Sequence, residues 1–278
     1  AYYVERYWPG YAGEVVQPPY AHWPDVPGFE PARIDLARAC YYGEITMVDA
    51  WLSHLLRRVE DMGLLENTAI IFTSDHGFYF GEHAGSFGKM TLAKRPDGTL
   101  YRQSDADSQW DHSPLYEELV RVPLLVYQPG VPAGTYAGLT SAVDLMPTAM
   151  ELLGQSPPAW VEGGSLVPAL RDGGRRGRDF VVSTIPFGRI GDEVGSVDNV
   201  RRKMSGFETT VTTEEWALVY SLVPGRTELY HLRADPRQEG DVLAERPDVA
   251  GELHRTLVDF MRATNVPADL LEPRLVLR

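Results

Sequence analysis

The sequence predicts an α/β protein with a mostly parallel sheet flanked by helices, followed by a small antiparallel sheet and a helix. Two observations lead to this fold class. Helix, strand, loop, strand and helix patterns follow one another up to residue 154, and short alternating strand patterns replace them after about residue 157. We therefore expect two domains, residues 1–156 and residues 157–278. With 278 residues, 44% of them hydrophobic, the chain can bury a sizeable core.

The first strong pattern is a long amphipathic helix from Pro31 to Gly63. Its apolar residues recur at three- and four-residue spacing, and they pass through Ile34, Tyr41 and Leu52. Proline favours the first turn of a helix, and glycine is common just past its end. The residues before this helix are rich in proline and aromatic side chains, and their apolar positions follow neither the helical nor the strand period. We therefore expect an extended segment lying over a surface.

Two short apolar runs follow the helix, "TAIIFTSD" and "RVPLLVYQPG", and both are typical of strands. The Gly- and His-rich segment that follows the first run and the polar insertion after it, "AKRPDGTLYRQSDADSQWDHS", are both expected to form loops. "SAVDLMPTAMELLGQ" then predicts a helix that ends at Gly154 and that Asp144 could cap.

The remainder of the chain predicts the smaller domain. "DFVVSTI", "TTVTTEEWALVYSLV" and "TELYHL" have the alternation of short strands, and "DVAGELHRTLVDFMRAT" has the period of a final helix.

Composition narrows the choice of partners. A formal charge of −13 would repel nucleic acid and anionic membranes, so we expect neither as a partner. No run of about 18 apolar residues predicts a membrane span. The single cysteine, Cys40, excludes an internal disulfide framework, and with the lack of a signal-peptide pattern it slightly favours the cytoplasm in a localisation that otherwise stays open.

The candidate chemistry begins where the first strand ends. Asp75 and His76 directly follow the apolar run, and Gly77 allows the chain to turn. Ligands of open α/β sheets collect beyond the carboxyl ends of strands. A carboxylate and an imidazole are half of a ligand set for a divalent cation. The alternative is an aspartate that caps the following turn while the histidine bonds to it.

Five ordered motifs resemble the sulfatase family of the alkaline phosphatase superfamily. They are "NTAIIFTSDHG", "GEHAGSFGK", "YEELVRVPLLVYQPG", "SAVDLMPTAMELLG" and "ELYHLRADPRQEGDVLAERPDV". The resemblance covers roughly Ala32 to the C-terminus. Over this range the chain is similar to the C-terminal portion of a sulfatase. It implies an alkaline phosphatase-like fold, of which residues 1–156 would form part of the α/β core with half of the metal site.

The resemblance also implies roles for particular residues. Asp75 and His76 match positions that complete a cation site, which usually holds Ca²⁺ and in related phosphonate and phosphodiester hydrolases Mn²⁺ or Zn²⁺. Lys89 matches the lysine that contacts the sulfate. "GEHAGSFGK" departs from the commonest form of the motif, because it has one residue more.

The family's nucleophile has no match here. Sulfatases carry a Cys-x-Pro-x-Arg or Ser-x-Pro-x-Arg motif whose first residue becomes formylglycine, whereas Cys40 stands in "ACYYGE" without the proline and the arginine. We therefore expect Cys40 to be a buried helix residue. We expect this chain to hold about half of an active site and to be inactive alone. Its expected partner is the missing N-terminal part of the same polypeptide.

Two histidines are candidate proton donors to a leaving oxygen, His83 in "GEH" and His112 in "QWDHS". Either could instead be a surface or loop-anchoring residue.

Three functions stay open. The first is metal-dependent hydrolysis of an anionic sulfate ester. The second is hydrolysis of phosphonates or phosphodiesters, which would use the same Asp–His pair. The third is a truncated, non-catalytic binding module.

Overall fold

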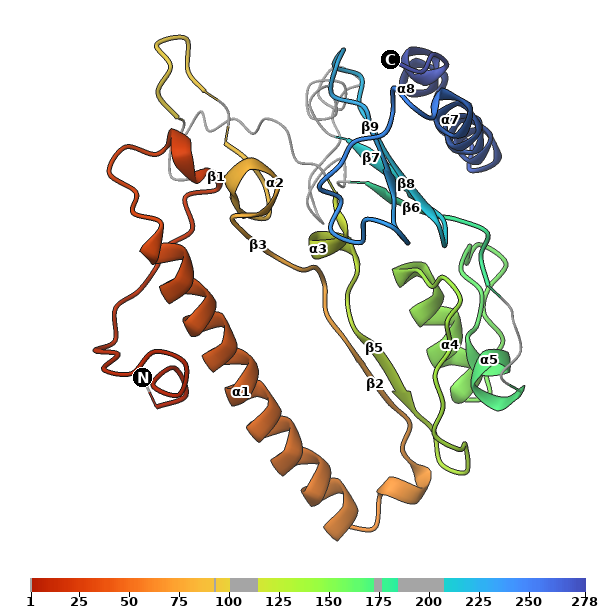
Figure 1. Cartoon of the computed structure of the whole chain (residues 1–278). Helices are drawn as coiled ribbons and strands as arrows, with labels where there is room; N and C mark the ends of the chain where they lie inside the picture. Colours follow the sequence, from red (N-terminus) through yellow and green to blue (C-terminus); the bar gives the residue numbers. More distant parts are fainter. Residues whose placement is uncertain (1, 93, 101–114, 173–176, 185–207) are drawn as a thin grey trace. The chain divides into compact units, whose positions relative to one another are not determined.

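The computed structural model describes residues 2–92, 94–100, 115–172, 177–184 and 208–278 (Figure 1). His112 and most of the predicted loop of residues 94–113 lie outside the described residues. The elements, in chain order, are β1 (Ala21–His22), η1 (Trp23–Asp25), α1 (Ala32–Asp61), η2 (Leu65–Asn67), β2 (Ile70–Thr73), β3 (Tyr79–Phe80), α2 (Glu82–Gly85), β4 (Ser86–Gly88), α3 (Glu117–Val120), β5 (Leu124–Tyr127), η3 (Ala142–Asp144), α4 (Leu145–Leu152), α5 (Val167–Asp172), β6 (Val181–Thr184), β7 (Thr209–Thr212), β8 (Trp216–Tyr220), β9 (Glu228–His231), α7 (Pro247–Ala263), α8 (Ala268–Leu271) and η4 (Glu272–Arg274).

The chain forms two compact units, residues 1–112 with 121–129, and residues 113–120 with 130–278. The predicted division after residue 156 stays a prediction.

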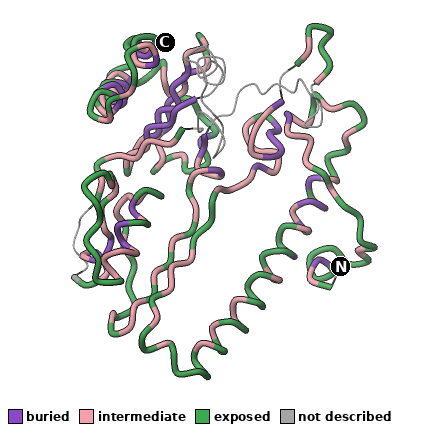
Figure 2. Tube along the Cα trace, turned by 180° about the vertical axis from the view of Figure 1, so that it is seen from behind, coloured by how far each residue is buried: buried purple, intermediate pink, exposed green. Residues whose placement is uncertain are grey.

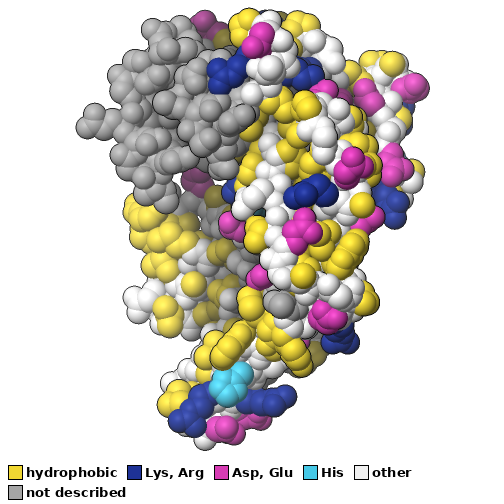
Figure 3. All heavy atoms as spheres, turned by 90° about the vertical axis from the view of Figure 1, so that its left-hand side faces the viewer, with side chains coloured by type: hydrophobic (Ala, Val, Ile, Leu, Met, Phe, Trp, Pro, Cys, Tyr) yellow, Lys and Arg dark blue, Asp and Glu magenta, His cyan; other side chains and the backbone are white. Residues whose placement is uncertain are grey.

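Helix α1 of the first unit confirms the predicted amphipathic helix, but only its first turns are buried. The buried positions lie between Ile34 and Gly43. Further along, the same apolar stripe is open to solvent, and Trp51 is 65% exposed. Figure 2 shows this change along the helix, and Figure 3 shows hydrophobic side chains reaching the surface on one face of the molecule.

Strands β2 and β5 form where the two apolar runs predicted them, yet they pair antiparallel, with Ile70 opposite Tyr127 and Thr73 opposite Leu124. In the described residues every strand pair is antiparallel. The expectation of a mostly parallel sheet is therefore wrong for this part of the chain. The reason is physical: an apolar run predicts a buried strand, but the connection from β2 to β5 is long enough to return in either direction.

A small sheet in the order β1-β4-β3 packs on the start of α1. The Gly- and His-rich segment after β2, predicted as a loop, instead contains a hairpin, in which Tyr79 pairs with Gly88 and Phe80 with Phe87. Ile34, Ala37 and Phe87 form its core with partly buried aromatic neighbours such as Phe78 and Phe80. Trp23 and Phe29 of the proline- and aromatic-rich N-terminal segment pack against the same core.

The second unit contains the antiparallel sheet β6-β7-β8-β9, as predicted for the C-terminal region. Helix α7 covers it with a stripe that includes Leu253 and Leu257, and the sheet contributes Val211, Leu218 and Leu229 to the same core. Figure 2 shows the buried residues concentrated on these strands and this helix.

Asp144 is the last residue of η3 and directly precedes α4. The predicted cap on α4 is wrong, because the Asp144 side chain makes no cap hydrogen bond to that helix; it forms instead a capping box with Ser141, the N-cap of η3. The Asp144 side chain accepts the backbone N–H of Ser141 at 2.9 Å and that of Gly164 at 2.8 Å. The guanidinium of Arg178 donates to both carboxylate oxygens, with Nε at 3.0 Å from Oδ2. This carboxylate therefore ties three separate stretches of the second unit together.

Within the described residues, no helix combines the length and the apolar character needed to cross a bilayer.

Candidate active site

The turn after β2 presents Asp75 to solvent, with 81% of its side chain exposed. The turn is held by its own polar groups. Oδ1 of Asp75 accepts the backbone N–H of His76 at 2.9 Å, and the hydroxyl of Ser74 donates to the carbonyl oxygen of His76 at 3.1 Å. The other carboxylate oxygen, Oδ2, makes neither of these two bonds.

Hydrogen bonding fixes the tautomer of His76. Its Nδ1 lies 2.8 Å from the carbonyl oxygen of Gly77, and because a carbonyl only accepts, Nδ1 must carry the proton. In the neutral ring the lone pair is then on Nε2. This atom lies 3.3 Å from Oδ2 of Asp75. Two electron-donating atoms therefore converge, which is the arrangement a cation requires.

Lys89 completes this cluster, with its Nζ 2.9 Å from Nε2 of His76. The ammonium donates to the ring nitrogen, since lysine has no acceptor. The hydrogen bond from the His76 N–H lowers the pKa of the Asp75 carboxyl group, and the positive charge of Lys89 contributes in the same direction. Asp75 is thus held as a carboxylate near the ammonium group of Lys89.

The hairpin explains how Lys89 reaches this place despite the additional residue in its motif. Lys89 directly follows β4, whose pairing with β3 returns the chain toward Gly77. Residues 81–85 form a left-handed turn, where His83 has φ 51° and Ala84 has φ 61°. Gly85 has φ 94°, and a Cβ atom there would lie 2.8 Å from side-chain atoms of Trp23 and Pro24, so the turn requires glycine at this position.

His83 lies in the closed turn of the hairpin, whereas Lys89 follows its open end. The ring of His83 packs edge-on to Tyr79, with centroids 5.8 Å apart. The hairpin therefore places this candidate proton donor at the opposite end from Lys89. His112, the other candidate, lies outside the described residues and stays a prediction. Cys40 lies on α1 as predicted, but its thiol is half-buried and not buried, and it forms no disulfide.

Sequence reasoning missed the residues that support this hairpin. Arg38 of α1 donates to the carbonyl oxygen of Phe80 at 2.6 Å, and Glu82 accepts the backbone N–H of the same residue at 2.5 Å. No local sequence pattern indicated that Arg38 and Glu82 meet at this residue, because they lie 44 residues apart in the chain.

The cluster fits part of a metal site. In the portion of the chain that the structure describes, no group of three or more His, Cys, Asp or Glu side chains could hold an ion. Asp75 and His76 therefore supply one carboxylate and one imidazole, which suit a divalent cation but do not satisfy the six to eight ligands that Ca²⁺ prefers. Lys89 suits an anionic group next to that cation.

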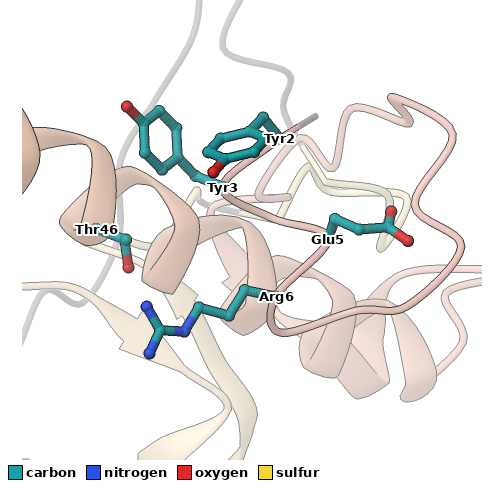
Figure 4. Close-up of a pocket in the computed structure, with 5 residues that line it drawn as sticks. All are labelled: Tyr2, Tyr3, Glu5, Arg6 and Thr46. Carbon is teal, nitrogen blue, oxygen red and sulfur yellow. The ribbon is translucent and has the colours of Figure 1, made fainter.

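A hollow elsewhere in the first unit has a different lining (Figure 4). It measures about 540 Å³ and is lined by Tyr2, Tyr3, Glu5, Arg6 and Thr46. None of these belongs to the predicted site.

The family model for sulfatases matches residues 5–155, more than half of the chain, and this chain belongs to the sulfatase family. The match extends upstream of Ala32, where the resemblance of the motifs began.

Among characterised proteins, the chain is 27% identical over 208 residues to N-acetylglucosamine-6-O-sulfatase of Bacteroides thetaiotaomicron, covering 74% of this chain and 32% of that protein. It is 26% identical over 248 residues to arylsulfatase K of Bos taurus, covering 87% and 40%. The chain thus spans well under half the length of these relatives.

Solved structures give the same picture of the fold. A putative sulfatase from Bacteroides fragilis matches with a TM-score of 0.67 at 18% identity, over 97% of this chain and 51% of that one. A phosphonate monoester hydrolase of Agrobacterium radiobacter matches with a TM-score of 0.60 at 25% identity, over 84% and 42%. The chain therefore has a sulfatase-like α/β fold and corresponds to about half of these structures.

Proposed function

We propose that this chain forms part of a sulfate-ester hydrolase. It would supply two metal ligands, Asp75 and His76, and the ammonium group of Lys89 that contacts the substrate. One observation carries this proposal: Oδ2 of Asp75, Nε2 of His76 and Nζ of Lys89 meet beside one turn. Family membership and the names of the relatives support sulfate esters as the substrate class.

Each side chain has a defined task in this proposal. Asp75 and His76 would hold the divalent cation, Ca²⁺ by the family resemblance, with Mn²⁺ or Zn²⁺ as alternatives. A bound cation supplies Lewis-acid polarisation of the ester oxygens. The ammonium of Lys89 moves from Nε2 of His76 to an oxygen of the transferring group, where it offsets the negative charge that develops in the transition state. His83 and His112 remain candidates for protonating the leaving oxygen.

The complete polypeptide is the proposed partner. The exposed stripe of α1, which includes Ile45, Val48 and Leu55, is unusual for a helix that remains in water. We infer that it packs in the whole protein against the part of the fold that the matched structures have and this chain does not cover. Hydrogen exchange would test this: the amides of α1 should exchange more slowly in the longest natural polypeptide than in the 278-residue chain.

Activity assays test the substrate class. The longest natural polypeptide that contains this chain should hydrolyse 4-nitrophenyl sulfate in the presence of Ca²⁺. Lys89→Ala should lower the kcat of this polypeptide by roughly 10²- to 10³-fold. This is the loss seen in other enzymes when one hydrogen-bond donor to the transition state is removed. The control is Lys94→Ala, since Lys94 pairs with Asp25 at 2.9 Å instead. Equal kcat values for Lys89→Ala and the unmodified enzyme would contradict the proposal.

Phosphonate or phosphodiester hydrolysis is the second candidate, because a phosphonate monoester hydrolase is among the structural relatives. Comparison of kcat/KM on an aryl sulfate and an aryl phosphonate separates the two. The 278-residue chain by itself should hydrolyse neither, since positioning and charge alone do not replace covalent catalysis. Turnover by this chain would show that it contains an unrecognised nucleophile, whereas inactivity of the longest natural polypeptide would favour a non-catalytic module.

A further inference from the structure

Besides the apolar contacts of Ile34 and Ala37 with Phe87, helix α1 bonds to the hairpin that leads to Lys89 through Arg38. The guanidinium of Arg38 lies 2.6 Å from the carbonyl oxygen of Phe80, the last residue of β3, and 3.4 Å from Oε1 of Glu82. Both acceptors belong to the hairpin, on either side of Gly81. A planar guanidinium can hold two such acceptors in a fixed geometry.

Glu82 connects the same points from the hairpin side. While Oε1 faces Arg38, Oε2 accepts the backbone N–H of Phe80 at 2.5 Å. Each backbone polar group of Phe80 is therefore bound by one member of the ion pair. We call Arg38 and Glu82 together the Arg38–Glu82 clamp.

The clamp holds a turn that the backbone would not adopt by itself. His83 and Ala84 both have positive φ, a conformation that L-residues with a Cβ atom avoid. The hairpin has only two residue pairs in register, Tyr79 with Gly88 and Phe80 with Phe87. Such a short ladder leaves its register weakly determined. Additional contacts must therefore keep the strained turn and the register in place.

We propose that Arg38 and Glu82 are positioning residues for Lys89, and this inference rests on the proposed function. The ammonium of Lys89 follows β4 immediately, so a shift of one residue between β3 and β4 would turn its side chain to the other face of the hairpin. The clamp prevents this shift by fixing Phe80, which pairs with Phe87 two residues before Lys89. Neither clamp residue needs to touch the substrate.

Three variants separate positioning from general stabilisation. Glu82→Ala removes both contacts of the carboxylate, whereas Glu82→Gln retains an oxygen that can accept the Phe80 N–H. Asp35→Asn is the matched control, because Asp35 pairs with the same arginine at 3.4 Å but contacts no part of the hairpin through that bond. All three are compared with the unmodified protein.

The kinetic readout uses the longest natural polypeptide. Glu82→Ala should lower kcat on the sulfate ester by roughly 10- to 100-fold, with KM changed by less than about threefold, because misplacement of a transition-state group acts on the chemical step. Glu82→Gln should restore part of this loss, and Asp35→Asn should leave kcat unchanged. An unchanged kcat in Glu82→Ala would overturn the proposal.

A second readout in the 278-residue chain is independent of activity. In Glu82→Ala the amide of Phe80 should exchange with solvent at least roughly tenfold faster, as expected when one charge-assisted hydrogen bond is lost. The nuclear Overhauser contact between the side chains of Lys89 and His76 should also disappear, while Asp35→Asn retains it. Persistence of that contact in Glu82→Ala would overturn the clamp even if the enzyme proved inactive on sulfate esters. Loss of the contact together with an inactive parent enzyme would support the clamp and reject only the proposed function.

Discussion

The two units of this chain differ in how completely they bury their own apolar residues. In β8 of the second unit, Leu218 and Val219 are 0% exposed, and helix α7 packs over the same sheet. In β5 of the first unit, Leu125 is 59% exposed. Both strands come from apolar runs of similar appearance. Among the described residues, the second unit thus buries a large core between its sheet and α7, whereas the core of the unit that carries Asp75, His76 and Lys89 is concentrated around its hairpin.

The largest expected effect tests the core of the second unit. Leu218→Ala should reduce the free energy of unfolding by about 2–5 kcal/mol, because it removes buried methyl groups and leaves a cavity. Leu125→Ala is the matched control and should change it by less than about 0.5 kcal/mol. Urea denaturation followed by circular dichroism measures both. Equal losses in the two variants would show that the units do not differ in this way.

The next effect concerns Asp144, which is 2% exposed. Asp144→Asn should cost about 1–3 kcal/mol, since hydrogen-bond donors around a buried carboxylate lose their charged partner. Burial opposes ionisation of Asp144, but hydrogen bonds from Arg178, Gly164 and Ser141 outweigh it and lower the pKa of this carboxyl group.

The direction of the pH dependence follows from that lowered pKa. Its stabilising contribution is present above the pKa of the unfolded chain, about 3.9, and is lost as the pH falls through the lower folded pKa. The stability of the unmodified protein should therefore fall more steeply below about pH 4 than that of Asp144→Asn. Parallel stability curves for the two proteins in thermal unfolding across this range would contradict the assignment.

A smaller effect of opposite sign is expected in the hairpin of the first unit. Ala84→Gly should stabilise the protein by about 1 kcal/mol, because glycine adopts positive φ without the cost that alanine incurs there. Ala50→Gly, at an exposed position in α1, should instead destabilise it by about 1 kcal/mol. Thermal unfolding of both variants checks this contrast, and destabilisation by Ala84→Gly would show that the left-handed turn is not strained.

Much of the local structure was predictable from the sequence. The apolar period predicted α1 and α7, and the apolar and alternating runs predicted β2, β5 and the C-terminal strands. Strand direction was not predictable, because the pattern of β2 and β5 does not depend on their pairing. The hairpin was missed, since β3 and β4 are too short to show a period.

The candidate site was predictable in its residues but not in its geometry. Asp75 and His76 follow a strand as expected, and the family motif indicated Lys89. The position of Lys89 could not be derived from the motif, because no sequence pattern indicates that His83 and Ala84 adopt positive φ in the turn that precedes it. The clamp depends on a contact between Arg38 and Glu82, which lie far apart in the sequence, and no local pattern indicates it.

Calorimetric titration of the 278-residue chain with Ca²⁺ and Mn²⁺ tests the half-site most directly. Asp75 and His76 offer two ligands with the ammonium of Lys89 beside them, so Ca²⁺ should bind weakly, with a Kd of about 1 mM or above, or not at all. Asp49→Ala, at an exposed position on α1, serves as the control for Asp75→Ala. Micromolar binding that disappears in Asp75→Ala and persists in Asp49→Ala would show that this chain already contains a complete metal site, and would contradict the half-site.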